Sequence, residues 1–254
     1  MSRKRRGLVS QREVSKLSDV ELAVEGVSKY FGGFCALDGV SFEIRRGEAL
    51  GLVGPNGSGK TTLLNVICGL YPPTKGRIFF RGSRVDGHKP HLLAKAGINR
   101  TFQLAKPFKS LTVRENIDLA LSHRNGDGAS LDEILHLTNL TSMVGVEAGN
   151  LNAGQQKRLD LARAISLEPS VLFIDELGAG LNPVELNELA EMLRKMQSGG
   201  RAIVVVEHLM GFLEKVVDHV LVLNAGKEIF RGELRQALGD QDVKRVFLGD
   251  SVGN

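Results

Sequence analysis

The stretch "GPNGSGKT", residues Gly54–Thr61, decides the fold of this chain. It fits the pattern G-x-x-x-x-G-K-[ST] with no mismatch. The apolar run "EALGLVG" before it predicts a strand buried on both faces, and "KTTLLNVICGL" after it has the spacing of a helix that ends at Gly69. A glycine-rich loop between a strand and a helix is the context in which this pattern binds phosphate groups.

The residues of this loop fit the phosphate chain of a nucleotide. Glycines let the loop wrap around the phosphates without Cβ clashes, and the backbone N–H groups and the helix N-terminus then face the anion. Lys60 supplies a positive charge to the β- and γ-phosphates, and Thr61 offers a hydroxyl to Mg²⁺. The predicted nucleotide-binding residues of this segment are Gly54, Pro55, Asn56, Gly57, Ser58, Gly59, Lys60, Thr61 and Thr62.

Two later strand ends carry the side chains that hydrolysis needs. The run "VLFIDE", Val171–Glu176, predicts an apolar strand that ends in two carboxylates. We expect Asp175 to hold the Mg²⁺ shell and Glu176 to orient or deprotonate the attacking water. The run "VVVEHL" places His208 after a strand expected to neighbour the acidic one, where its imidazole can contact the γ-phosphate and hold Glu176 and the water in place.

Strand and helix patterns alternate along the rest of the chain. Helical patterns near Gln155–Ser166 and Val184–Met196 separate the strand-like runs "VLFID", "AIVVVEH" and "HVLVLNAG". This alternation predicts an α/β fold with a mainly parallel core sheet. Near the N-terminus, the alternating runs Leu22–Val27 and Val40–Ile44 predict antiparallel strands, with Gly32-Gly33 as the turn between them. The middle of the chain, Leu111–Leu151, is predicted to be helical.

The basic character of the chain belongs to its first residues. Residues 1–19 hold six Lys or Arg and two Asp or Glu, which is a net charge of +4 and equals the net charge of all 254 residues. The body, residues 20–254, is therefore neutral, so we expect no nucleic-acid partner for it. We predict a disordered tail over residues 1–19, with contact to anionic lipid or RNA as the alternative, followed by one domain over residues 20–254.

Hydropathy and cysteine content limit where the chain can act. Its longest apolar runs are too short to cross a bilayer, and no apolar stretch follows the basic residues as a signal peptide requires. Cys35 and Cys68 lack the spacing of a metal site, so we expect them to be reduced core residues of a cytosolic protein.

Taken together, these motifs resemble the ATP-binding cassette (ABC) ATPases from about Val20 onward. Gly54–Thr61 resembles the Walker A motif and Val171–Glu176 the Walker B motif with its catalytic glutamate, while His208 resembles the switch histidine. Gln103, in "NRTFQ", resembles the Q-loop glutamine, for which the family implies both a catalytic and a metal-binding role. Further likenesses are the D-loop at Ala179–Asn182, the adenine-stacking aromatic Phe31 with Tyr30 as its rival, and a signature segment at Asn152, Ala153, Gly154 and Gln155.

The resemblance implies a P-loop NTPase of ABC type, with an antiparallel β subdomain and a helical signature subdomain over about residues 104–168. Such domains dimerise head to tail and hold ATP and Mg²⁺ between the P-loop of one subunit and the signature of the other, with Asn182 near the nucleotide. They act at the cytoplasmic face of the membrane on transmembrane permease subunits, which bind the groove around the Q-loop, here predicted at Gln103–Thr112. The second subunit of the dimer is either another copy of this chain or a similar ABC ATPase.

A closer likeness is to the ATPase subunits of branched-chain amino acid importers and their urea and amide relatives. It is carried by "YFGGFCALDGVSF", "RTFQ", "AGLNP" and "RVFLGD", and it implies an extracytoplasmic solute-binding protein in the full complex. Leu177 departs from the proline that this group usually has, and the helical segment is shorter than in many members. The alternatives are a lipid or lipopolysaccharide exporter ATPase, an ABC ATPase that moves no solute, and a nucleotide sensor that does not hydrolyse.

The signature segment itself, "LNAGQ", differs from the usual family form LSGGQ. Asn152 replaces the serine, and its side chain can both cap a helix and donate a hydrogen bond. Ala153 adds a methyl group where glycine is usual, which restricts the backbone or crowds the phosphate. Our hypothesis is that the segment is a working variant.

Overall fold

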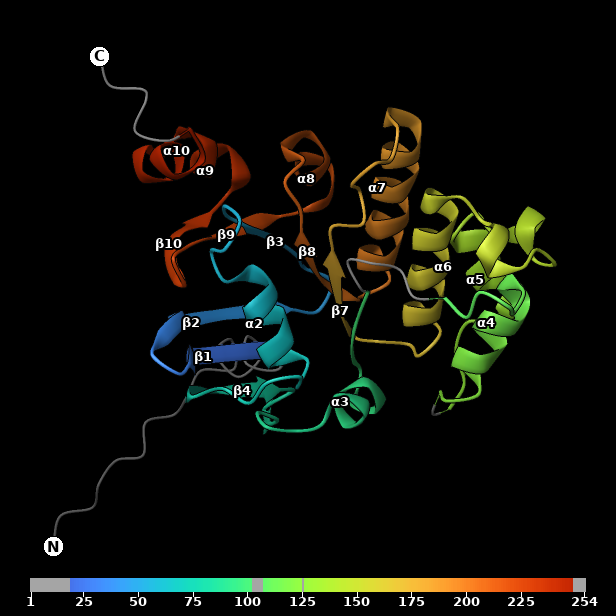
Figure 1. The fold of residues 1–254 in the computed structure, drawn as a ribbon, viewed down its shortest axis with the longest axis horizontal. Coiled ribbons are helices and arrows are strands. Elements are labelled where there is room, and N and C mark those ends of the chain that lie inside the picture. Colours follow the sequence, from blue (N-terminus) through green and yellow to red (C-terminus); the bar gives the residue numbers. More distant parts are fainter. Residues whose placement is uncertain (1–18, 102–106, 125, 249–254) are drawn as a thin grey trace, which may run out of the picture.

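The structure is a computed structural model that describes residues 19–101, 107–124 and 126–248. Its strands form two sheets (Figure 1). The antiparallel sheet has the order β2-β1-β4-β5 and comprises β1 (Val20–Phe31), β2 (Phe34–Arg45), β4 (Lys75–Phe80) and β5 (Ser83–Arg84). The core sheet has the order β10-β9-β3-β8-β7-β6 and comprises β3 (Ala49–Val53), β6 (Ile98–Arg100), β7 (Val171–Asp175), β8 (Ala202–Val206), β9 (His219–Asn224) and β10 (Lys227–Gly232).

Strand pairing confirms the fold predicted from the sequence. In the core sheet β6, β7, β8, β3 and β9 pair in parallel, and β10 adds an antiparallel edge through a hairpin with β9. The runs predicted as antiparallel lie in β1 and β2, and Phe31 pairs with Phe34 across the Gly32-Gly33 turn. Gly32 has φ +57°, a left-handed conformation that glycine adopts without a Cβ penalty.

Alternate residues of each core strand face two different apolar layers. In β7, Leu172 and Ile174 pack with the helices that follow the strands, whereas Val171 and Phe173 pack with the antiparallel sheet and the P-loop helix. A strand buried on both faces has to be apolar at every position, and all five residues of β7 are buried. This explains the continuous apolar runs of the sequence.

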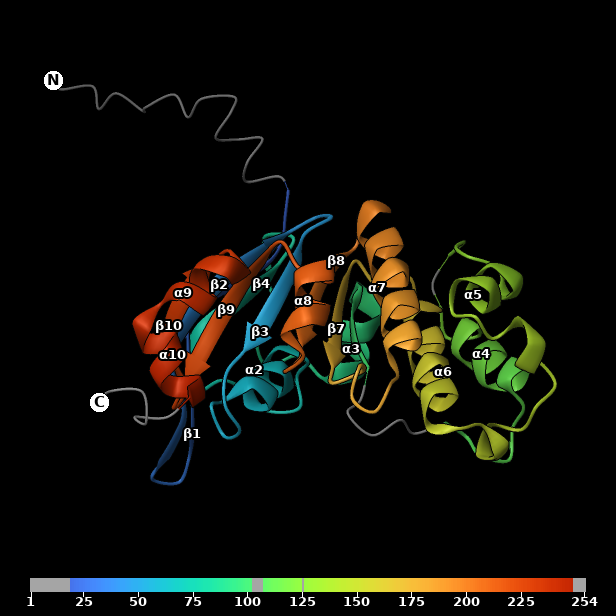
Figure 2. The ribbon, with the colours of Figure 1, turned by 90° about the horizontal axis from the view of Figure 1, so that it is seen from above.

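Helices cover both faces of the core sheet (Figures 1 and 2). One apolar layer includes buried residues of α2, and the other includes those of α6, α7, α8 and α9. None of the helices in the described part of the chain is long and apolar enough to cross a membrane. The helices are α2 (Lys60–Ile67), α3 (Pro90–Ala96), α4 (Val113–Leu121), α5 (Leu131–Leu137), α6 (Ala153–Ile165), α7 (Pro183–Ser198), α8 (Met210–Val216), α9 (Leu234–Gly239) and α10 (Gln241–Leu248), with 3₁₀ turns η1 (Thr141–Met143) and η2 (Ala148–Asn150).

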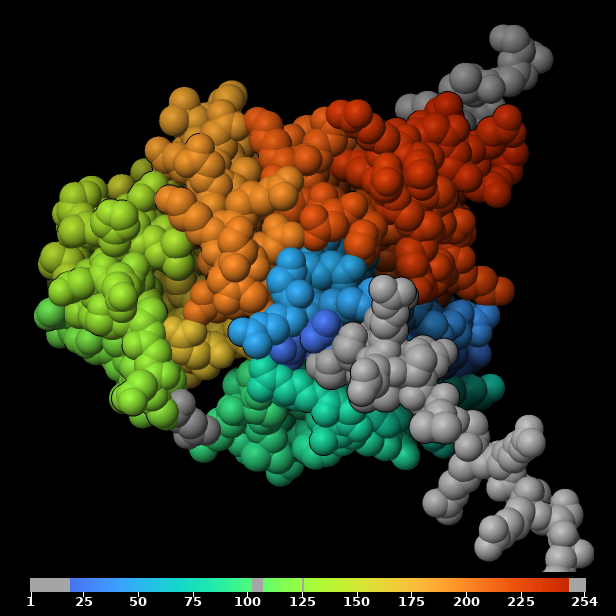
Figure 3. Space-filling view, turned by 180° about the vertical axis from the view of Figure 1, so that it is seen from behind, coloured from blue at the N-terminus to red at the C-terminus, as the bar shows by residue number. Residues whose placement is uncertain are grey.

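The predicted helical middle of the chain is confirmed and forms one end of the molecule, as Figure 3 shows from behind. Two of its helices begin with capping boxes that are visible in the sequence. In α4 the box is formed by Thr112 and Glu115, and in α5 by Ser130 and Glu133. The apolar faces of α4, α5 and α6 join the same layer that α7 and α8 form against the core sheet. The helical region is therefore packed continuously onto the sheet.

Candidate nucleotide-hydrolysis site

The P-loop, residues 54–59, connects the carboxyl end of β3 to the first turn of α2. Gly54 has φ +149°, and a Cβ there would lie 2.2 Å from the carbonyl oxygen of Leu223. Gly59 has φ +106°, and a Cβ there would lie 2.8 Å from the carbonyl oxygen of Ala36. Any other residue at these two positions would force backbone apart, so the glycines are required for the loop to fit between β9 and β2.

Polar groups inside the P-loop are arranged for an anion. Lys60 Nζ donates to the carbonyl oxygens of Gly54 at 2.7 Å and Pro55 at 2.9 Å, so the side chain curls back over its own loop. Burial lowers the pKa of Lys60, while the nearby charges of Glu176 and Asp175 raise it. The hydroxyl oxygen of Ser58 is buried and has no hydrogen-bond partner among the described residues. A buried hydroxyl without a partner is costly in a folded protein, and a phosphate oxygen in the loop would supply the missing partner.

Asp175 ends β7 and is only 2% exposed. Burial raises the pKa of its carboxyl group, whereas the neighbouring Arg100 lowers it. Arg100 Nη2 lies 3.1 Å from Asp175 Oδ2, and Arg100 Nη1 donates to Asn65 Oδ1 at 2.6 Å. Arg100 is a residue that sequence reasoning missed; the only signal was its place in "NRTFQ", at the end of the strand next to β7.

The catalytic candidates Glu176 and His208 lie side by side. His208 Nε2 is 3.4 Å from Glu176 Oε1, although the two residues are 32 positions apart in the sequence. The parallel pairing of β7 with β8 brings them together, because each follows the carboxyl end of its strand. Glu176 has φ +50°, a conformation that residues other than glycine rarely adopt and that is often found at functional sites.

Glu207 is a second residue that the sequence reading did not single out. It is 2% exposed, and its Oε1 accepts a hydrogen bond from the backbone N–H of Gly178 at 2.6 Å. Burial raises the pKa of Glu207, and the N–H groups of Gly178 and His208 and the charge of Lys157 lower it. This carboxyl group thus anchors the loop after Asp175 to the strand end that carries His208.

The predicted base-stacking residue Phe31 ends β1, at the turn of the β1–β2 hairpin. Its ring is 42% exposed and meets Tyr71 edge-on, with the ring centroids 5.2 Å apart. Lys29 Nζ lies 5.1 Å from the centroid of Phe31 and donates to the carbonyl oxygen of Pro72. Tyr71 was missed because only the fold brings the segment after α2 against the β1–β2 hairpin.

The structure describes Asn182 but not Gln103, two further residues predicted to act at the nucleotide. Gln103 lies outside the described residues, so its catalytic and metal-binding roles stay predictions. Asn182 caps α7: its Oδ1 accepts the backbone N–H groups of Val184 and Glu185. An exposed cap of this kind, at the start of a helix, leaves its side-chain amide group available to a ligand.

The signature segment begins α6 as a capping box. Asn152 Oδ1 accepts from the backbone N–H of Gln155 at 2.8 Å, and Gln155 Oε1 accepts from the N–H of Asn152 at 2.9 Å. Asn152 and Ala153 are exposed, and Ala153 is the first residue of the helix. Figures 1 and 2 both place α6 and α2 on opposite sides of β7, so the signature segment and the P-loop of one chain do not form one site.

A P-loop, a Walker B-type strand end and a separate signature helix on this sheet define a nucleotide-hydrolysing cassette. The family model described as ABC transporter matches residues 37–179. The chain is 33% identical over 251 residues to the high-affinity branched-chain amino acid transport ATP-binding protein BraF of Pseudomonas aeruginosa. The matched region covers 91% of this chain and 98% of that protein. It is 34% identical to the probable branched-chain amino acid transport ATP-binding protein LivG of Archaeoglobus fulgidus, over 90% of this chain and 95% of that protein.

Solved structures of ATP-binding cassettes have the same fold. A nucleotide-free ATP-binding cassette from an ABC transporter superposes with a TM-score of 0.82 at 30% identity, over 91% of this chain and 100% of that one. A dimeric cassette in a post-hydrolysis state, bound to ADP and Pi, gives a TM-score of 0.75 at 26% identity, over 84% of this chain and 99% of that one.

The chain belongs to the ABC transporter family and is the ATP-binding and ATP-hydrolysing subunit of such a transporter. As an ABC ATPase it dimerises and works with membrane permease subunits.

Proposed function

We propose that this subunit powers the import of branched-chain amino acids, or of a related small polar solute such as urea, from the cytoplasmic face of the membrane. The observation that carries the proposal is the 33% identity to BraF over nearly the full length of both chains. The full complex would include an extracytoplasmic solute-binding protein, and the second ATPase would be another copy of this chain or a similar subunit.

In the proposed reaction, Glu176 orients or deprotonates the water that attacks the γ-phosphate. His208, 3.4 Å from Glu176, holds that carboxylate and contacts the γ-phosphate. Lys60 exchanges its two carbonyl partners in the P-loop for β- and γ-phosphate oxygens. The remaining P-loop residues wrap the phosphates, and Phe31 stacks on the adenine.

The donor set fits Mg²⁺, which prefers one or two carboxylate or hydroxyl oxygens together with phosphate oxygens. Asp175 and Thr61 would hold the ion, as would Gln103, and the ion would neutralise charge on the phosphates. Arg100 Nη2 lies 3.1 Å from Asp175 Oδ2 and compensates the buried charge of this carboxylate. The same carboxylate would hold Mg²⁺ when nucleotide is bound.

The signature segment completes the site of the partner subunit. Asn152 and Ala153, at the N-terminus of α6, are exposed, and the N–H groups of this helix end would face the γ-phosphate held by the other P-loop. The capping box uses Asn152 Oδ1, so the amide N–H₂ of the same side chain is left to donate to that phosphate. This is why we infer that the variant signature works.

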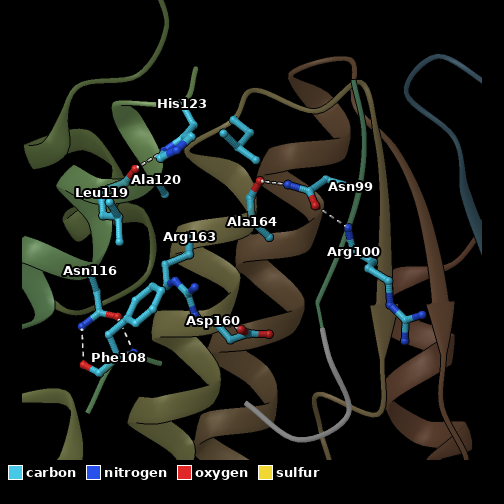
Figure 4. A pocket seen from close by; sticks show the side chains of 11 residues that line it. Asn99, Arg100, Phe108, Asn116, Leu119, Ala120, His123, Asp160, Arg163 and Ala164 are labelled. Carbon is cyan, nitrogen blue, oxygen red and sulfur yellow. Dashed lines mark hydrogen bonds and ion pairs between the residues drawn. The ribbon is translucent and has the colours of Figure 1, made fainter. Parts of the chain in front are cut away.

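A pocket of about 360 Å³ lies where β6, α4 and α6 meet (Figure 4). Phe108, 48% exposed, stacks under the guanidinium of Arg163, and Leu119 of α4 also lines the pocket. The pocket adjoins the chain segment predicted to meet the permease, part of which lies outside the described residues. We infer that a permease segment docks here, so Phe108→Ala should reduce transport while basal ATPase activity stays near that of the parent.

The deciding experiment reconstitutes this chain with its permeases and binding protein in liposomes and measures ATP-dependent uptake of labelled leucine and of labelled urea. Glu176→Gln should abolish hydrolysis and uptake, keep ATP binding and trap a dimer. Glu191→Gln, an exposed acid on α7, is the matched control and should keep both activities. Persistent hydrolysis by Glu176→Gln would remove Glu176 as the base, and efflux of lipid without solute uptake would replace the importer proposal.

A further inference from the structure

Lys157, in the second turn of α6, contacts the turn that carries Glu176. Its Nζ donates to the carbonyl oxygens of Glu176 at 3.2 Å, Leu177 at 3.1 Å and Ala179. An ammonium group has three N–H donors, so these three carbonyl oxygens occupy all of them. Lys157 therefore fastens the signature helix to the backbone of residues 176–179.

This turn needs such support because its backbone is strained. Glu176 is held at φ +50°, and a residue other than glycine in this conformation persists only where its surroundings fix it. On the side of β8, the N–H of Glu176 donates to the carbonyl oxygen of Val206 at 2.9 Å, and the N–H of Gly178 donates to Glu207. On the side of α6, the described contacts to these backbone carbonyls come from Lys157.

Packing and charge also favour the contact between α6 and the turn that carries Glu176. The first turn of α6 also approaches the loop: a Cβ on Gly154 would lie 3.1 Å from Leu181 Cδ2. Burial lowers the pKa of Lys157, while the charges of Glu207 and Glu176 raise it. A charged group that is partly removed from water keeps its charge when opposite charges and hydrogen-bond acceptors surround it.

We propose that Lys157 is a positioning residue that sets the place of the catalytic Glu176 relative to the signature helix of the same chain. The inference rests on the proposed function, because it needs Glu176 as the catalytic base. In a head-to-tail dimer the signature helix contacts the nucleotide of the partner, whereas Glu176 acts on the nucleotide of its own chain. Lys157 thus links the two hydrolysis sites of the dimer and makes the position of Glu176 respond to the nucleotide at the other site.

The test compares Lys157→Met, which keeps the length of the side chain but removes all donors, with Lys157→Arg, which restores charge and donors. Lys244→Met, an exposed lysine on α10, is the matched control. We expect Lys157→Met to lower kcat roughly tenfold to a hundredfold with an unchanged Kd for ATP, because a displacement of about 1 Å has an effect of this size. It should also bring the Hill coefficient for ATP to about 1, whereas Lys157→Arg should recover at least part of both.

Two results would overturn the inference. One is an unchanged kcat in Lys157→Met, and the other is a parallel loss of kcat, ATP affinity and thermal stability that Lys157→Arg does not repair. If Lys157→Met does not fold, Lys157→Leu, whose side chain also lacks N–H donors, is measured in its place with the same expectation. Glu176→Gln separates this inference from its premise: if that variant still hydrolyses ATP, the catalytic role assigned to Glu176 under the proposed function fails, whereas its loss of activity beside an active Lys157→Met rejects only the role of Lys157.

Discussion

Replacing Arg100 with Met should destabilise the protein by leaving the carboxylate of Asp175 buried without its partner. The two side chains are 9% and 2% exposed and lie 3.1 Å apart. Removing one partner of a buried ion pair costs about 3–5 kcal/mol, because an uncompensated charge remains away from water. For a chain of this size, that loss corresponds to a Tm lowered by roughly 6–20 °C.

The pH dependence of the loss follows from Asp175. Burial already raises the pKa of this carboxyl group, and removing Arg100 takes away the charge that lowers it. An acid whose pKa is raised in the folded state binds its proton more tightly there than in the unfolded chain, so stability falls as the pH rises. The deficit of Arg100→Met should therefore be larger at alkaline pH than in mild acid.

Denaturant unfolding, followed by circular dichroism, measures the effect. Arg45→Met is the matched control: Arg45 forms an exposed ion pair with Glu43 at 3.6 Å, and we expect a loss below about 1 kcal/mol. The double variant Arg100→Met, Asp175→Asn removes both charges and should recover more than half of the loss. The reasoning is refuted if Arg100→Met loses less than about 1 kcal/mol, or if the double variant is as unstable as the single one.

Four further predictions concern the nucleotide site, the tail and the signature. Lys60→Ala should weaken ATP binding about tenfold to a hundredfold, since a hydrogen bond to a charged group contributes about 1.5–3 kcal/mol; an unchanged Kd in an ATP titration would reject the P-loop assignment. Glu207→Gln should raise Tm near pH 8, and the gain should shrink as the pH falls toward the ordinary pKa of 4.5, because burial raises the pKa of Glu207; a gain that is the same at every pH would contradict this. Deleting residues 2–18 should leave the ATPase rate intact, and an inactive product would show that the tail is structural. Combining Asn152→Ser with Ala153→Gly should raise the ATPase rate of an active parent; an inactive parent rescued by the pair would show that the signature is damaged.

The signature segment shows which features can be predicted from neighbouring residues in the sequence. Asn152 was predicted to cap a helix, and its side-chain oxygen accepts a hydrogen bond from the backbone N–H of Gln155, three residues later. The same holds for the P-loop, where Gly54 and Gly59 have the conformations that the pattern requires. Local interactions of this kind depend on neighbours in the chain, so the sequence predicts them.

Arg100, Lys157 and Tyr71 show the opposite case. Each contacts a functional residue that is distant in the chain: Arg100 meets Asp175, Lys157 meets the carbonyl of Glu176, and Tyr71 meets Phe31. The residues around Lys157 and Tyr71 do not indicate these partners, and the only signal for Arg100 is its place at the end of the strand next to β7. Long side chains on strand ends, helices and loops are common on ordinary surfaces.

The sequence by itself predicted the α/β class, the strands and helices around the P-loop and the acidic strand end, and the chemistry expected there, because periodicity and turn residues act over a few positions. The sequence also predicted that the strand before His208 lies beside the acidic strand, and the structure confirms it. Only the tertiary structure decided the full strand order of the core sheet, which places Arg100 beside Asp175, and the packing of α6 that brings Lys157 to the backbone of Glu176. Sheet order is set by packing between distant segments, and burial and pairing of charges therefore become visible only once the chain is folded.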